Sequence, residues 1–362
     1  MLFESYDLGG IRLANRTVMA PMTRSRCSHN SAPDALVAKY YEQRATAGLI
    51  VTEGTAPSPN GVGYARIPGI YNEVQVQGWR LVTEAVHKAG GKIFVQLMHT
   101  GRVSHQDNLP AGARVVGPSP EACPGEMWTD KAGLQAHTVP AAMTEVDIAQ
   151  AVAEYASAAR LAIKAGFDGL ELHAANGYLM EQFLNANVNK RTDGYGASAD
   201  ARNRFTLEVA QACVDAIGAD KVGIRISPLG VFNGTGAFDG VEDQFLALTK
   251  KLSGMGLVYL HLVDHSAMGA PPVPAELKTK LRAAFARTFI AVGGFDAQSA
   301  EKVLQAKEAD LIAFGRPFIS NPDLVARMKS GAALAAPDMN TFYTPGEKGY
   351  TDYPGLAQSS SQ

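Results

Sequence analysis

The sequence lacks the cysteine patterns that mark disulfide-bonded or metal-binding proteins. It has three cysteines in 362 residues, and Cys27, Cys123 and Cys213 are widely separated and never form a C-x-x-C pair. Such spacing predicts neither a disulfide framework nor a zinc or iron–sulfur site. We interpret the three as buried or incidental thiols and expect no bound metal.

The chain also has no excess of charge and no long apolar run. Its 33 Lys and Arg balance 35 Asp and Glu, so no basic stripe is available for nucleic acid or an anionic membrane. No uninterrupted apolar stretch approaches the roughly 18 residues that span a bilayer. The start, MLFESYDLGG, has no basic region followed by an apolar core. We therefore expect a globular protein of the cytoplasm.

Several common active-site motifs are absent as well. The sequence contains no G-x-G-x-x-G, no G-x-x-x-x-G-K-[ST], no H-E-x-x-H and no G-x-S-x-G. These motifs serve dinucleotide binding, phosphate binding, zinc catalysis and serine catalysis. A separate nicotinamide-binding domain is therefore not predicted.

What the sequence does contain is a regular alternation of short β-branched or apolar runs with longer segments of helical period. Such alternation indicates a parallel sheet, and eight strands indicate a closed (β/α)8 TIM barrel. The expected strands are Thr17–Ala20, Leu49–Glu53, Lys92–Leu97, Gly169–His173, Val222–Ile226, Leu257–Val263, Phe289–Val292 and Leu311–Phe314. We expect one domain over residues 1–356.

Other segments add detail to this barrel. A capping box at Thr144 and Asp147 begins a helix, and Gly218 and Gly254 are expected to stop two later helices. Leu8 to Ile11 reads as a hairpin turn that could plug the end of the barrel opposite the active site. The tail, residues 357–362, is expected to be disordered.

The third strand is followed by an unusually long loop, residues 99–143, rich in Pro, Gly, Ser and His. Loops of this length are usually functional, and loops after barrel strands form the active-site face. We expect a capping insertion that walls the substrate site; a disordered linker is the alternative.

Polar residues gather where the predicted strands end. They are Pro21, Thr23, Glu53, Gly54, Gln96, His99, His173, Asn176 and Tyr178, with Arg225 inside the fifth strand. Gln96 and Arg225 suit the edge of a flavin ring, although a sugar phosphate could use them too. His173 and Asn176 are three residues apart, so they would converge on one ligand oxygen if the chain winds helically there.

Glycines follow the last two strands and predict a phosphate site. The seventh strand runs into Gly293 and Gly294, and the eighth into Gly315 and Arg316 just before a helix. Barrels commonly bind phosphate with these loops, and Arg316 would add a charged fork. The alternative is that the glycines serve only as turns. A sugar phosphate, pyridoxal phosphate and flavin mononucleotide all remain possible ligands at this point.

Seven segments together resemble the Old Yellow Enzyme family of FMN-dependent ene-reductases. They are APMTRSR, VQLMHTGR, LHAANGYL, NKRTDGYGAS, the strand that carries Arg225, AFGRPFISNPDLV and GYTDYP, in order along nearly the whole chain. The resemblance implies a TIM barrel that binds FMN noncovalently. The implied cofactor-binding residues are Pro21, Met22, Thr23, Gly54, Gln96, Arg225, Gly293, Gly294, Gly315 and Arg316.

The resemblance also implies catalytic residues and a reaction. His173 and Asn176 would hold the activating oxygen of the substrate, and Tyr178 would protonate its α-carbon after hydride transfer from flavin N5. Thr23, Tyr64, Met98 and Tyr343 would line the substrate pocket. NADPH or NADH would supply the hydride in a ping-pong reaction, with enones, enals, maleimides or nitroalkenes as acceptors. Nitrate esters and nitroaromatics are further possible substrates, and the protein is expected to be a monomer or homodimer.

The sequence departs from the family pattern at three positions. Met98 stands where some relatives carry Trp, Asn176 replaces the second His of others, and Ala197 interrupts a Gly-Gly pair. The first change reshapes the substrate pocket. The competing functions are a phosphate-binding barrel lyase or isomerase without flavin, and a noncatalytic flavin-binding protein.

Overall fold

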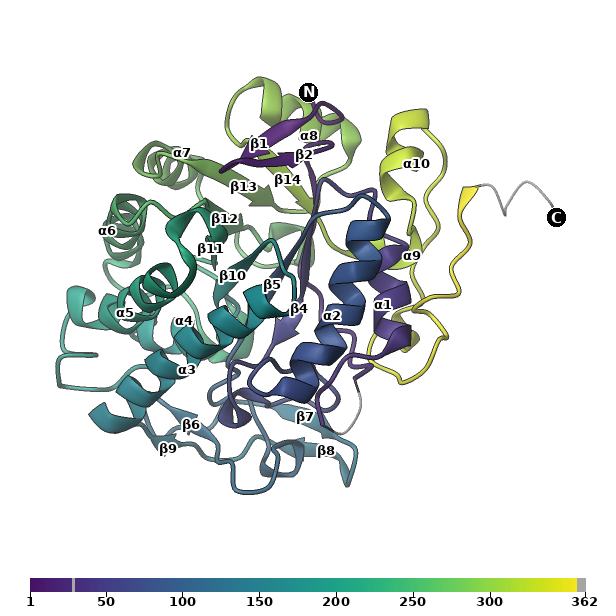
Figure 1. Cartoon of the computed structure of the whole chain (residues 1–362). Coiled ribbons are helices and arrows are strands. Elements are labelled where there is room, and N and C mark those ends of the chain that lie inside the picture. Colours follow the sequence, from purple (N-terminus) through teal and green to yellow (C-terminus); the bar gives the residue numbers. More distant parts are fainter. Residues whose placement is uncertain (28–29, 357–362) are drawn as a thin grey trace.

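The protein is a closed barrel of eight parallel strands surrounded by helices (Figure 1). The computed structural model describes residues 1–27 and 30–356, so the expected disordered tail lies outside the described residues. The barrel strands are β3 (Thr17–Met19), β4 (Leu49–Thr55), β5 (Ile93–Leu97), β10 (Gly169–Ala174), β11 (Val222–Ile226), β12 (Tyr259–Val263), β13 (Thr288–Val292) and β14 (Leu311–Phe314). The predicted fold is confirmed, and every expected strand is present with ends that differ by at most two residues.

The helices follow the strands as in a (β/α)8 barrel. They are α1 (Ala35–Glu42), α2 (Glu73–Lys88), α3 (Glu145–Lys164), α4 (Leu179–Leu184), α5 (Ala199–Ile217), α6 (Val241–Gly254), α7 (Ala275–Ala284), α8 (Ala297–Gln305), α9 (Arg316–Ser320) and α10 (Leu324–Ser330). A continuous apolar core lies between them and the strands. Within the described residues, no helix combines the length and apolar character needed to cross a membrane.

Local sequence signals place the helix ends. Thr144 and Asp147 form the predicted capping box of α3, in which each side chain accepts a hydrogen bond from the other residue's backbone amide. Gly218 ends α5 with a φ of 92°. Helix α6 ends at Gly254, as expected, and the left-handed residue that follows it is Gly256.

The N-terminal hairpin closes the foot of the barrel, as predicted. Strands β1 (Tyr6–Leu8) and β2 (Ile11–Leu13) pair antiparallel. Leu8 and Leu13 are fully buried against residues near the strand starts, among them Leu49 and Phe94. Figure 1 shows this hairpin at the top of the view, at the end opposite the strands of the long insertion.

The insertion of residues 99–143 forms short strands of its own. Strand β6 (Val116–Gly117) pairs with β9 (Ala141–Ala142), and β7 (Glu126–Thr129) pairs with β8 (Gly133–Ala136). Asn108 Nδ2 donates a hydrogen bond to the carbonyl of Gly63, and Arg102 donates to the carbonyl of Asn233. The insertion thus contacts the loops after β4 and β11, and its role as a substrate wall stays a prediction.

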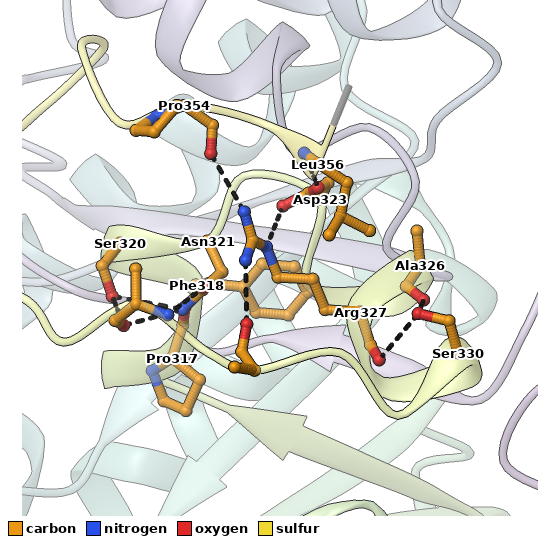
Figure 2. A network of polar contacts seen from close by, with 12 residues as sticks. Pro317, Phe318, Ser320, Asn321, Asp323, Ala326, Arg327, Ser330, Pro354 and Leu356 are labelled. Carbon is orange, nitrogen blue, oxygen red and sulfur yellow. Dashed lines mark hydrogen bonds and ion pairs between the residues drawn. The ribbon is translucent and has the colours of Figure 1, made fainter. Parts of the chain in front are cut away.

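A network of hydrogen bonds links the segments of the chain after β14 to one another (Figure 2). Arg327 donates to the Asp323 carboxylate at 2.7 Å and to the Pro354 carbonyl at 3.1 Å. Asn321 donates to the Pro317 and Ala335 carbonyls and accepts from the Ala335 amide. The polar residues of the FISNPDLV segment therefore serve to hold the C-terminal chain in place.

Candidate active site

Three of the predicted site residues lie side by side on neighbouring strands. His173 on β10 is paired in register with Arg225 on β11, and Gln96 on β5 is paired with Gly54 on β4. His173, Arg225 and Gln96 are 3%, 7% and 2% exposed. Because paired residues of parallel strands point to the same face, these side chains converge inside the C-terminal end of the barrel.

A β-bulge brings Gly54 to its position. The register of β4 against β5 shifts between Val51 and Gly54. Val51 pairs with Phe94 but Gly54 pairs with Gln96, so β4 advances three residues where β5 advances two. A Cβ at Gly54 would lie 2.4 Å from the Met98 sulfur. Only glycine at this position leaves room for Met98, which packs in an apolar cluster with Tyr64 and Tyr178.

Tyr178, His173 and Tyr64 form an aromatic group at this end of the barrel. The Tyr178 ring meets the His173 ring edge to face at 5.0 Å and the Tyr64 ring at 6.1 Å. The hydroxyls of Tyr178 and Tyr64 are 3.1 Å apart. Tyr178 is the N-cap residue of α4 but its side chain does not cap the helix, which leaves its hydroxyl free to face Tyr64.

The chain does not wind helically after His173, so the condition given for the convergence of His173 and Asn176 is not met. Asn176 has a φ of 60° and Gly177 a φ of 77°, which makes a left-handed turn before α4 begins. Asparagine tolerates this conformation better than most residues. The Asn176 amide donates to Ser227 Oγ at 2.9 Å, and its carbonyl accepts from Asn233 Nδ2 at 2.7 Å. The turn is held by residues that follow β11.

Burial keeps the three ring residues uncharged at neutral pH. It lowers the pKa of His173 well below its ordinary value, and the Arg225 cation acts in the same direction. It raises the pKa of Tyr178, although the hydrogen bond from Tyr64 opposes this, and it raises that of Tyr64 well above the usual range. Tyr178 therefore keeps a proton to donate.

The segment Pro21, Met22 and Thr23 follows β3 and is half-buried. Arg24, which comes next, donates from its amide to Glu53 and from its guanidinium to the Gly349 carbonyl at 2.7 Å. Arg26 adds a bond to the Phe342 carbonyl at 2.6 Å. The segment is therefore anchored between β4 and the C-terminal chain.

The glycine loops lie at the ends of β13 and β14, as expected for a phosphate site. Gly294 has a φ of 77°, and Gly315 is the N-cap residue of the five-residue helix α9. A Cβ at Gly315 would lie 3.6 Å from the Met22 sulfur, so this loop adjoins the segment after β3. Arg316 is exposed and makes no hydrogen bond or ion pair with the part of the chain described here. It is free to pair with an anion.

Tyr343 lies at the edge of the group. Its side chain is 61% exposed, and its carbonyl accepts a hydrogen bond from Arg66. It is near enough to Tyr64 and Tyr178 to contribute to their raised pKa values. Its place is the outer rim of the site.

Several buried polar atoms at this end have no partner among the described residues. They include Arg225 Nε, His173 Nδ1 and Asn176 Oδ1. Unpaired buried polar groups are costly, so native proteins rarely retain them without a ligand or water. A guanidinium, an imidazole and an amide at the same end of the barrel as the glycine loops fit the polar edge and the phosphate of FMN.

Two buried residues of this region were missed as site residues. Glu171 and His261 lie within buried strands in which polar residues alternate with leucine, and both are fully buried. The signal was present, because Glu171 is two residues before His173 and so faces the same side of β10. A charged residue at an inward position of a buried strand calls for a partner, and His261 Nδ1 supplies it at 2.8 Å.

Known proteins resemble this chain over nearly its whole length. The model of the NADH:flavin oxidoreductase / NADH oxidase family matches residues 1–335. Chanoclavine-I aldehyde reductase of Penicillium roqueforti is 43% identical and aligns over 97% of this chain and 95% of its own. The solved structure of morphinone reductase has a TM-score of 0.95 at 42% identity, covering 100% of this chain and 98% of that one. A structure of morphinone reductase in complex with tetrahydroNAD has a TM-score of 0.93 at 42% identity, covering 100% and 99%.

Proposed function

The chain belongs to the NADH:flavin oxidoreductase / NADH oxidase family, and on that premise we propose that it reduces activated carbon–carbon double bonds with NADPH or NADH. It is an FMN-dependent oxidoreductase of the Old Yellow Enzyme type. The observation that carries the proposal is the position of Tyr178 against His173 and Tyr64, beside Gln96 and Arg225.

The residues that would hold FMN surround the barrel end. Gln96 and Arg225 suit the pyrimidine edge, Gly54 and the segment Pro21–Thr23 the other edges, and Gly293, Gly294, Gly315 and Arg316 the phosphate. Held by these residues, FMN would supply hydride transfer between the nicotinamide and the substrate. Both substrates would use the same site in turn.

His173 and Asn176 bind the oxygen of the substrate's carbonyl or nitro group in this proposal. The neutral His173 ring donates one hydrogen bond, and Asn176 offers its amide group from the left-handed turn. Donors aimed at this oxygen stabilise the negative charge that develops on it as the double bond is reduced. Ser227 and Asn233 support the proposal because they hold the turn in place.

Tyr178 delivers the proton to the α-carbon. Its raised pKa favours the protonated form at neutral pH, so a proton is available. Tyr64, 3.1 Å away, donates a hydrogen bond to the Tyr178 oxygen as the proton leaves. Met98 and Tyr343 limit the shape of the substrate, with enones, enals, maleimides and nitroalkenes as the proposed class. The relatives named as reductases of morphinone and of an aldehyde support this choice.

An anaerobic absorbance experiment tests the proposal. The purified protein should show a flavin band that bleaches with NADPH and returns on addition of 2-cyclohexenone. A band that bleaches but does not return with any activated alkene would refute alkene reduction. A colourless protein that FMN cannot reconstitute would favour the flavin-free phosphate-binding lyase or isomerase instead.

A further inference from the structure

Glu171 is a buried carboxylate whose neighbours come from two other strands of the barrel. It is 0% exposed. It accepts hydrogen bonds from Gln96 Nε2 at 2.8 Å, from the Tyr259 hydroxyl at 3.0 Å and from His261 Nδ1 at 2.8 Å. A buried carboxylate needs such donors to remain in place, because burial without them costs several kcal/mol.

The side chain of Tyr259 on β12 can reach Glu171 on β10 because residue 223, on the strand between them, is glycine. Strand β11 lies between β10 and β12, and Gly223 on β11 is paired in register with Glu171. A Cβ at Gly223 would lie 2.3 Å from the Tyr259 ring. The absence of a side chain there lets the Tyr259 ring pass over β11 to Glu171.

The charges at this level of the barrel come from Glu171 and Arg225. Although burial acts against ionisation, His261, Arg225 and Gln96 hold the pKa of Glu171 below its ordinary value. Burial lowers the pKa of His261, so this ring is neutral and donates from Nδ1. A negative Glu171 therefore lies on the strand beside that of a positive Arg225, and the two form no ion pair.

The ionised carboxylate determines which end of the Gln96 amide faces outward. A carboxylate only accepts hydrogen bonds, so Gln96 must turn its NH2 group toward Glu171. Gln96 Oε1 accepts no hydrogen bond from the described residues and is the end left for a ligand. If the Gln96 amide were turned round, its Oε1 would face the Glu171 carboxylate, and two hydrogen-bond acceptors would lie against each other.

We propose that Glu171 is a positioning residue for the flavin: it orients the Gln96 amide and offsets the charge of Arg225. This inference rests on the proposed function, because both effects act on bound FMN. The reduced cofactor carries more negative charge than the oxidised one, so Arg225 without its counter-charge would favour the reduced form. Glu171 thus keeps the flavin a stronger hydride donor than Arg225 alone would allow.

The substitution Glu171→Gln tests both effects on the FMN-loaded protein. The midpoint potential of the bound flavin should rise, with about a tenfold shift toward the reduced form, or about 30 mV for a two-electron couple. The affinity of the apoprotein for FMN, measured by fluorescence quenching, should fall about tenfold because the Gln96 amide can then adopt either orientation. A folded variant with the wild-type potential would overturn the proposal.

The substitution Tyr259→Phe gives a second test, in which the Glu171 carboxylate itself is retained. Loss of one donor raises the pKa of Glu171, so the midpoint potential should exceed the wild-type value at acid pH and match it at pH 8. A difference in midpoint potential between variant and wild type that is the same at every pH would overturn the proposal. If Glu171→Gln does not fold, the Tyr259→Phe variant provides the test. A wild-type protein that binds no FMN would instead refute the proposed function itself.

Discussion

The two ends of the barrel are built from the same eight strands but have opposite chemistry. At the foot, the hairpin residues Leu8 and Leu13 pack on Leu49, Phe94 and other apolar side chains with no exposed surface. At the mouth, the inward positions two residues further along the strands carry Gln96 and Glu171. Polar atoms of His173, Asn176 and Arg225 are left there without partners. A single strand thus contributes to stability with one residue and to chemistry with another.

The difference shows how the barrel separates these tasks. The foot gains stability from burial of apolar area, whereas the mouth keeps polar groups unpaired at a cost in stability. Substitutions at the foot should therefore change unfolding without changing the reaction. Substitutions at the mouth should change the reaction with less effect on unfolding.

The largest effect should come from Tyr178→Phe at the mouth. Loss of the proton donor should slow oxidation of the reduced enzyme by 2-cyclohexenone about 10²- to 10⁴-fold. Reduction by NADPH should be nearly unchanged, because it needs no proton from Tyr178. Stopped-flow measurement of the two half-reactions separates the effects, with Tyr64→Phe as the control that removes only the partner hydroxyl. An unchanged oxidative rate would exclude Tyr178 as the donor.

At the foot, Leu13→Ala should lower the free energy of unfolding by about 2–5 kcal/mol, because it leaves a cavity in a closed apolar cluster. Chemical denaturation measures this change. The rate of each half-reaction per folded molecule should stay at the wild-type value. The control Leu81→Ala, at a leucine that is 50% exposed, should change stability little. A slower half-reaction in Leu13→Ala would show that the two ends are not independent.

Glu181→Gln should change how the free energy of unfolding depends on pH, because Glu181 is a buried carboxyl group that holds the turn at Gly177 near the mouth. Glu181 accepts hydrogen bonds from the Gly177 amide and Ser227 Oγ, and burial raises its pKa to about 8. A carboxyl group with a raised pKa in the folded state loses stability as pH rises from about 4.5 through 8. The variant should therefore be more stable than wild type by about 4 kcal/mol at pH 8 and similar to it near pH 4.5. A pH-independent difference in denaturation midpoints would contradict this assignment, and Glu84→Gln serves as an exposed control.

His173→Ala should give the smallest of these effects. Phenols that occupy the oxygen-binding position should bind about tenfold more weakly, because one hydrogen bond to a buried oxygen is lost. The long-wavelength absorbance expected from a phenolate stacked on the flavin should weaken with it. A phenol titration followed by absorbance measures both, and His87→Ala on the surface of α2 is the control. The same titration curve in wild type and His173→Ala would remove the residue from this role.

Much of the site could be predicted from the sequence because its residues sit at strand ends that local patterns reveal. Gln96 and His173 lie at the ends of apolar runs and Arg225 lies within one, and the structure brings the three together as the barrel predicts. The turn at Asn176 was not predictable from spacing. A spacing of three fits a helix, but Ser227 and Asn233, more than fifty residues later, hold the backbone in the left-handed region.

The sequence by itself determined the order of strands, the caps of the helices and the position of the glycine loops. Each of these depends on residues close together in the chain, such as the Thr144 and Asp147 capping box. Only the tertiary structure decided that Glu171 lies between Gln96 and His261, which are 75 and 90 residues away. The physical reason is that a buried carboxylate is satisfied only by donors that barrel closure brings to it, and no local pattern records which donors those are.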